Sequence, residues 1–188
     1  MSADILEEHA KGASLSSDVL AALIRQGIDM NAICSRVARG ILDPPRLDRV
    51  VFCDDGGFEF ARYRQVGPNK GAMIFVTRDY LGDAIDLVAW SPPHPPALWC
   101  SRGAILGGQS LFTLRMTDGL PVHPTPLEWL RDACRGVVII NEIKAAPLLR
   151  RAQPLQVSSI ERGRALSRML AVPPARIVVR PFLDRGAA

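Results

Sequence analysis

The first forty residues show the apolar spacing of two helices. Ser16 or Ser17 can accept hydrogen bonds from the first-turn amides of one helix, and Gly27 ends it. Its apolar stripe consists of Val19, Leu20, Leu23 and Ile24. A second helix is expected over residues 30–39, where Gly40 stops it. The pattern predicts a helical hairpin over residues 1–46.

Residues 47–96 show the short runs and turn residues of β-strands. The runs cover residues 50–52, 58–64, 73–77 and 85–90. Glycine-containing turns separate them, which predicts an antiparallel meander. Phe58 and Phe60 alternate onto one face, so we expect them in the core rather than in a base-stacking surface. The Pro-rich residues 91–96 cannot continue a ladder and indicate a boundary or a crossing loop.

Residues 97–188 alternate between helical and strand patterns. Helices are expected over residues 97–106, 127–134, 142–151 and 160–170, and strands over residues 111–115, 137–140, 155–157 and 176–179. Residues 116–126 are expected to form a loop. Such alternation is typical of βαβ units around a parallel sheet. The fold class predicted for the chain is therefore α+β, with the three segments forming one compact domain.

Size and cysteine spacing bear on how the fold is stabilised and where the protein resides. A chain of 188 residues that is 48% hydrophobic can bury a core without disulfides or a structural metal. None of the four cysteines lies at zinc-ligand spacing from another cysteine or a histidine, so buried free thiols in a reducing compartment are expected. The first eleven residues lack the apolar run of a signal peptide, and no stretch is long and apolar enough to span a bilayer. We expect a cytoplasmic protein with no membrane partner.

Positive charge is concentrated toward the C-terminus and consists almost entirely of arginine. Residues 1–60 carry 6 basic and 10 acidic groups, whereas residues 135–188 carry 10 basic and 3 acidic groups. Such an excess attracts a polyanion, and the guanidinium fork matches phosphate, so nucleic acid is the first partner to consider. The candidate phosphate contacts are Arg150, Arg151, Arg162, Arg164 and Arg168. The alternative is that these arginines form solvated helix faces.

The N-terminal hairpin also has the outline of a helix-turn-helix DNA reader. Arg36 and Arg39 lie on its second predicted helix, beyond a short glycine turn. Gln26 precedes that turn, where the motif has an apolar residue. A simple packed hairpin is therefore the favoured interpretation.

Polar residues follow the predicted C-terminal strands at the positions where α/β sheets bind ligands. Asn141 and Glu142 follow one strand, and Ser158 and Ser159 follow the next. Ligands of such sheets bind beyond the carboxyl ends of the strands, where helix N-termini offer free amides. The same residues also serve as helix caps, with Ser158 and Glu161 forming a capping box. Capping alone is the favoured interpretation.

The strand run at residues 137–140 and the Glu142 that follows it lie within a basic α/β segment. This arrangement resembles the Toprim domain of primases and topoisomerases, and the resemblance implies that Glu142 acts at a catalytic centre. Residues 82–86, Gly-Asp-Ala-Ile-Asp, are similar to the element that closes the zinc ribbon preceding that domain in bacterial primases. The chain departs from the family because it lacks the zinc ligands and an Asp-x-Asp pair, with Asp184 standing alone.

A second enzymatic interpretation takes residues 142–144 as the Glu-x-Lys of a nuclease. Asp118 would supply the other carboxylate, and Glu142 and Lys144 would help to hold Mg²⁺ and orient a water for phosphodiester attack. This arrangement requires residues 137–144 to form a single strand paired with residues 111–115. The Ala145–Ala146 pair that follows favours a helix instead.

Three functional hypotheses follow. The first is a non-catalytic protein without a cofactor, whose basic C-terminal face contacts nucleic acid, as an accessory of a bacterial or mobile-element replication system. The second is a magnesium-dependent phosphodiester enzyme centred on Glu142, with Asp118 and Lys144 or Asp184. The third is a protein-interaction domain with its tryptophans, Trp90, Trp99 and Trp129, partly at a partner surface. We favour the first because charge, rather than a catalytic motif, is the strongest signal.

Overall fold

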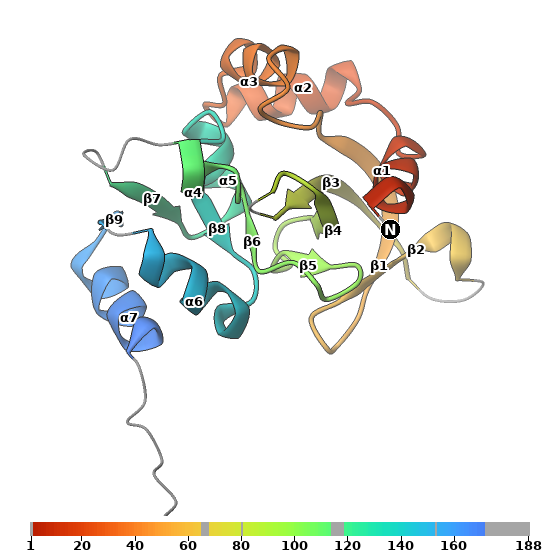
Figure 1. Cartoon of the computed structure of the whole chain (residues 1–188). Coiled ribbons are helices and arrows are strands. Elements are labelled where there is room, and N and C mark those ends of the chain that lie inside the picture. Colours follow the sequence, from red (N-terminus) through yellow and green to blue (C-terminus); the bar gives the residue numbers. More distant parts are fainter. Residues whose placement is uncertain (1, 65–67, 80, 114–118, 153, 172–188) are drawn as a thin grey trace, which may run out of the picture.

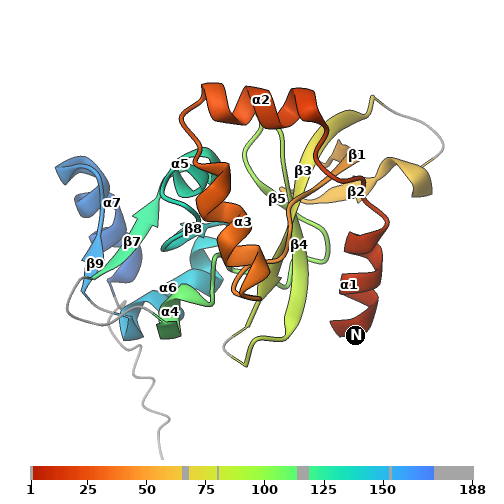
Figure 2. The ribbon, with the colours of Figure 1, turned by 90° about the horizontal axis from the view of Figure 1, so that it is seen from above.

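The structure is a computed structural model that describes residues 2–64, 68–79, 81–113, 119–152 and 154–171. Three N-terminal helices precede a five-stranded antiparallel sheet that curves into a near-barrel. A second, mixed four-stranded sheet with helices forms the C-terminal part (Figure 1). The predicted α+β class is confirmed. Helices α1 and α7 lie at opposite ends of the molecule (Figures 1 and 2).

Local capping explains the N-terminal helices α1 (Ser2–Ala10), α2 (Ser17–Arg25) and α3 (Met30–Ala38). The Ser16 hydroxyl accepts from the Val19 amide at 3.4 Å, as predicted. Gly27 ends the α2 turn with a φ of +82°, which favours glycine. Helix α1 was not predicted, because its packing face mixes the apolar Ile5 with the polar Glu8 and His9, all three of them buried.

The near-barrel comprises β1 (Arg46–Phe52), β2 (Phe58–Phe60), β3 (Lys70–Arg78), β4 (Ala84–Trp90) and β5 (Ala97–Leu98). Its order is β2-β1-β3-β4-β5, so β2 lies at an edge rather than between β1 and β3 as a simple meander requires. A bridge from Gly57 to Leu98 brings the two edges together. The predicted strand over residues 58–64 stops at Phe60, where a 3-10 turn, η1 (Ala61–Tyr63), begins.

Both faces of β3 and β4 are buried, which explains their continuous apolar runs. Met73 and Phe75 face one core with α2 and α3, whereas Ile74 and Val76 face a second core with α1. Phe58 and Phe60 are each 1% exposed in that second core, which confirms their predicted burial. The Pro-rich residues 91–96 connect two paired strands, β4 and β5, within one sheet.

The C-terminal sheet has the order β6-β8-β7-β9 and comprises β6 (Ile105–Leu106), β7 (Leu120–His123), β8 (Val137–Ile139) and β9 (Leu155–Gln156). Strand β7 is parallel to both β8 and β9, whereas β6 is antiparallel to β8. The sheet is therefore mixed rather than purely parallel. Helices α5 (Pro126–Arg131), α6 (Glu142–Arg151) and α7 (Ile160–Leu170) agree closely with the predicted helices.

Three predicted elements of the C-terminal part are wrong. Residues 97–106 form β5, a loop and β6 instead of a helix, because β5 pairs with the preceding strand β4 and β6 pairs with β8. The described part of residues 111–115 belongs to a short helix, α4 (Ser110–Thr113), instead of a strand. Residues 116–126 contain β7 instead of forming only a loop. The strand was not predicted, because Pro121 lies within it and proline is rare in central strands. The strand predicted at residues 176–179 lies outside the described residues.

The tryptophans lie mainly in the interior. Trp129 is fully buried, and its indole Nε1 donates to the Gly136 carbonyl at 3.1 Å. Trp90 is 8% exposed, and Trp99 packs edge-on against Phe60. This burial counts against the hypothesis that the indoles form a partner surface.

Candidate nucleic-acid interface

A groove of about 740 Å³ opens at the carboxyl ends of the parallel strands β7 and β8. Sheet and helix residues line it from three directions: His123 and Pro124 from the end of β7, Ile139, Ile140 and Glu142 from the end of β8, and Arg162, Ala165, Leu166, Arg168 and Met169 from α7. Ligands of α/β sheets bind at this edge, although helix capping alone was the favoured interpretation of the polar residues there.

Helix α7 is positioned by its cap and by an apolar contact with the C-terminal core. The Ser159 hydroxyl accepts from the Arg162 amide at 3.3 Å, so Ser159 rather than the predicted Ser158 is the cap. Leu166 and Met169 lie on the same helix face as Arg162 and pack against the core. The face that holds α7 on the protein thus also directs Arg162 toward the groove.

Arg150 has a structural contact that distinguishes it from the other predicted phosphate contacts. Its Nε donates to the Leu170 carbonyl at 2.8 Å, which links α6 to the last turn of α7. Arg162 is half-buried, whereas Arg151, Arg164 and Arg168 are exposed. The structure therefore places two predicted arginines, Arg162 and Arg168, on the groove, and the other three on the surrounding helices.

The arginines of this region lack acidic partners. Within the described residues, the side chains of Arg151, Arg162, Arg164 and Arg168 make no hydrogen bond or ion pair. Residues 136–171 contain six basic residues against two acidic ones, Glu142 and Glu161. Fixed positive charges that no carboxylate neutralises are available to an anionic ligand.

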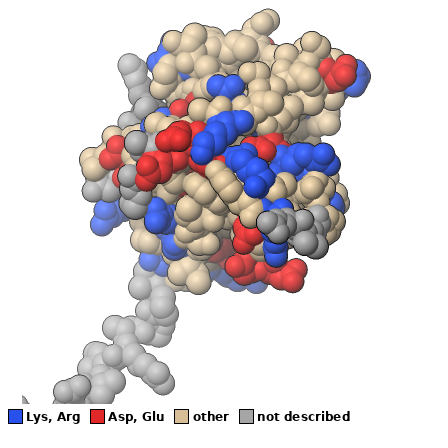
Figure 3. Space-filling view, turned by 90° about the vertical axis from the view of Figure 1, so that its right-hand side faces the viewer, with Lys and Arg blue, Asp and Glu red and all other residues tan. Residues whose placement is uncertain are grey.

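The opposite end of the molecule shows a different arrangement of charge. Figure 3 shows basic and acidic side chains interleaved on the face that carries α1, β1 and β2. Arg62 pairs there with Glu8 and Asp48, and Arg64 pairs with Glu59. Nearby, Arg78 pairs with Asp43 at 2.7 Å. These pairs neutralise one another, so this face attracts a polyanion less than the α6 and α7 region does.

The nuclease arrangement lacks the strand that it requires. Helix α6 begins at Glu142, and the Asn141 side chain caps it by accepting from the Lys144 amide at 3.1 Å. Glu142 and Lys144 thus lie in the first turn of a helix, and the Lys144 ammonium donates to the Ser101 carbonyl. Asp118 lies outside the described residues, as does Asp184. In the part of the chain that the structure describes, no three acidic, histidine or cysteine residues are grouped to hold a metal.

The second element of the Toprim resemblance lies in the other sheet. Residues 82–86 form the β3–β4 turn and the start of β4, where Gly82 has a φ of +87°. Asp86 is fully buried, and its carboxylate accepts from the amides of Cys100, Arg102 and Gly103 at 2.6–3.0 Å. This carboxylate therefore fixes the connection between β5 and β6.

His123 is the groove residue that the sequence did not reveal. It is one of three isolated histidines, and it ends a strand that contains Pro121 and is followed by Pro124. Its side chain is 15% exposed, and its Nε2 lies 3.0 Å from the Arg135 carbonyl and 3.4 Å from an Asp132 carboxylate oxygen. Those contacts orient the ring at the floor of the groove.

Comparisons with protein-family models, curated proteins and solved structures find no match. The described residues also include no helix long and apolar enough to cross a membrane. All four cysteines are free, as predicted, but the expected burial holds only for Cys134, because Cys34 is exposed and Cys53 and Cys100 are half-buried. The groove and its charges are therefore the features of the molecule that bear on its function.

Proposed function

We propose that the groove beside α7 binds the phosphate backbone of nucleic acid, and that the protein acts by binding rather than by catalysis. The observation that carries the proposal is the set of unpaired arginines, of which Arg162 and Arg168 line the groove. The proposal takes up the strongest signal in the sequence, the basic C-terminal segment. The role of the protein as a replication accessory stays a prediction.

The chemistry of the groove fits a charged chain better than a small apolar ligand. Arg162 and Arg168 come from two positions on α7, so one backbone can meet both along the helix. Each guanidinium can donate two parallel hydrogen bonds to a phosphate. Arg164, on the adjoining side of α7, and Arg151, at the end of α6, extend the positive surface beyond the groove.

Glu142 has a defined place in this proposal. It is an exposed carboxylate at the mouth of the groove, next to positions that would receive phosphate. Repulsion there would weaken binding modestly. The alternative in which Glu142 directs phosphodiester cleavage stays a prediction, and cleavage in the presence of Mg²⁺ that disappears in Glu142→Gln would support it.

The test uses two variants that each remove two positive charges. Arg162→Gln with Arg168→Gln removes the groove pair, whereas Arg25→Gln with Arg49→Gln removes two exposed arginines of α2 and β1 that form no ion pair among the described residues. Binding of labelled mixed-sequence single strands and duplexes is measured by fluorescence anisotropy at about 50 mM salt. Thermal unfolding confirms that both variants fold.

The proposal predicts that the groove variant binds at least about tenfold more weakly than the control variant, because charge-assisted phosphate contacts are lost. Equal affinities of the two variants would show that net charge alone governs binding. Absence of binding by the unmodified protein would refute the function itself.

A further inference from the structure

A second, smaller pocket of about 430 Å³ lies at one end of the near-barrel, away from the groove. Four separate chain segments form it: the end of β1 with Phe52, Arg64 after η1, Lys70 at the start of β3, and His94 in the β4–β5 connection. Its volume lies within the range of small-molecule sites, about 300–1,000 Å³. Only the fold brings these residues together.

An aromatic pair forms one wall of this pocket. The rings of Phe52 and His94 are stacked, with centroids 4.8 Å apart and planes 11° from parallel. Phe52 also packs against the second core, which holds the pair in place. Each ring of the pair keeps one face that its partner does not cover, and such a face suits another planar ring, since nucleobases stack on aromatic side chains regardless of their sequence.

A cation beside that wall has no carboxylate partner. The Lys70 ammonium contacts the His94 Nε2, and an ammonium can only donate, so that nitrogen is the acceptor. Lys70 forms no ion pair with any described residue. Arg64 also lines the pocket, and its only ion pair among the described residues is the exposed contact with Glu59 at 3.5 Å. A phosphate bound in the pocket can therefore interact with both cations, and only the exposed Arg64–Glu59 contact would be weakened.

We propose that this pocket binds one nucleotide unit, whose base stacks on the Phe52–His94 wall and whose phosphate is held by Lys70 and Arg64. The juxtaposition of an aromatic pair, a lysine without an ion pair among the described residues and an arginine with one exposed ion pair matches the two ends of a nucleotide. Asp54 is the one acidic residue at the pocket, and it lies exposed at the rim. The site is separate from the groove beside α7 and does not depend on it.

Calorimetric titrations with four probes test both halves of the site. The probes are AMP, adenosine, ribose 5-phosphate and a hexanucleotide of adenylate. AMP should bind more tightly than adenosine or ribose 5-phosphate, because only AMP engages both wall and cations. Binding by AMP alone would identify a free nucleotide as ligand, and binding by the hexanucleotide as well would identify a nucleotide within a strand.

Three variants of Lys70 and His94, with one control variant, test the contacts of the pocket with AMP. Lys70→Gln should weaken AMP binding by about tenfold or more, whereas Arg25→Gln, which removes one charge from α2, should leave it unchanged. His94→Leu should weaken it by about fivefold or more, and His94→Phe, which keeps a flat ring, should bind better than His94→Leu. Thermal unfolding verifies that each variant folds.

Equal affinity for AMP and ribose 5-phosphate would overturn the stacking role, and a lack of saturable AMP binding at about 10 mM would overturn the site. The groove variant Arg162→Gln with Arg168→Gln should bind AMP normally. Failure of this pocket and failure of the groove are therefore observed in different variants and with different probes.

Discussion

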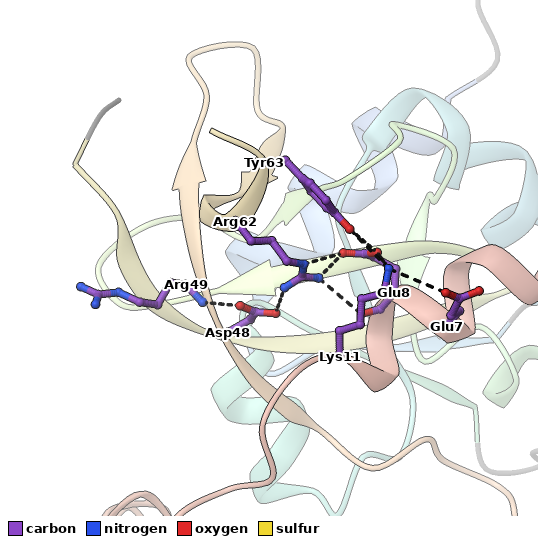
Figure 4. A network of polar contacts seen from close by, with 7 residues as sticks. All are labelled: Glu7, Glu8, Lys11, Asp48, Arg49, Arg62 and Tyr63. Carbon is purple, nitrogen blue, oxygen red and sulfur yellow. Dashed lines mark hydrogen bonds and ion pairs between the residues drawn. The ribbon is translucent and has the colours of Figure 1, made fainter. Parts of the chain in front are cut away.

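Helix α1 is attached to the near-barrel by a buried carboxylate. Removal of this carboxylate should lower the free energy of unfolding. The Glu8 side chain is 6% exposed and accepts from Arg62 Nε at 2.9 Å, Lys11 Nζ at 2.8 Å and Tyr63 Oη at 2.9 Å (Figure 4). Arg62 also pairs with Asp48 on β1. Glu8 thus joins α1 to the segment that follows β2.

The expected loss of unfolding free energy in Glu8→Ala depends on which of the three donors water can solvate after the change. Lys11 is 43% exposed on its side chain and Tyr63 is 60% exposed, so both can be solvated after the change. Arg62 is 28% exposed and keeps Asp48, so its charge is only partly uncompensated. Hydrogen bonds to charged groups contribute about 1.5–3 kcal/mol each, so we expect a loss of about 2–4 kcal/mol in the free energy of unfolding.

The effect of pH on Glu8 provides an independent check. Burial alone would raise the pKa of Glu8, but hydrogen bonds from Lys11, Arg62 and Tyr63 outweigh it and hold the pKa below the usual value of 4.5. A lowered pKa stabilises the fold above the unfolded value and loses that contribution as the pH falls through the folded value. The stability difference between the unmodified protein and Glu8→Gln should therefore shrink as the pH falls below about 4.5.

Urea unfolding followed by tryptophan fluorescence measures both effects. Glu7→Ala is the matched control, because Glu7 is 76% exposed and lies 3.8 Å from Lys11, and it should change stability by no more than about 0.5 kcal/mol. A Glu8→Ala loss as small as that of the control would refute the reasoning. So would a Glu8→Gln difference that does not change with pH.

Three further predictions concern the interior. Asp86→Ala should lower the unfolding free energy by about 3–5 kcal/mol in urea, because three loop amides lose their buried acceptor. A loss below about 1 kcal/mol would contradict this. Gly136→Ala should lower the melting temperature markedly, since Gly136 has a φ of +71° and an added Cβ would lie 2.2 Å from the Pro121 carbonyl oxygen. An unchanged melting temperature would contradict the tight packing. Burial raises the pKa of Cys134 to about 12, so a thiol reagent at about pH 8 should label the exposed Cys34 and spare Cys134 until the protein unfolds. Mass spectrometry identifies the labelled thiols. Labelling of Cys134 in the native protein would contradict its burial.

Elements governed by local signals were predictable from the sequence. Helices α2, α3, α6 and α7 each begin at a polar cap, and Asn141 caps α6 as expected. Such signals lie within a few residues of the element that they define. Short strands have no equivalent signal, because β5 exists through pairing with the preceding β4, and β6 and β7 exist through pairing with the later β8.

The candidate groove was only partly predictable for the same reason. Charge along the chain indicated Arg162 and Arg168, and the strand pattern indicated Glu142. His123 was not indicated, because β7 was not recognised. The aromatic wall was beyond sequence reasoning, since Phe52 and His94 lie far apart in the chain and meet only when β1 and the β4–β5 connection pack together.

The salt dependence of nucleic-acid binding tests the central claim most directly. Each phosphate contact contributes about 0.7 to the slope of log affinity against log salt on single strands and about 0.9 on duplex DNA. If Arg162 and Arg168 both contact phosphate, Arg162→Gln with Arg168→Gln should reduce the magnitude of the slope by about 1.4–1.8 relative to the unmodified protein, while Arg25→Gln with Arg49→Gln leaves it unchanged. An identical slope for all three proteins would contradict the account.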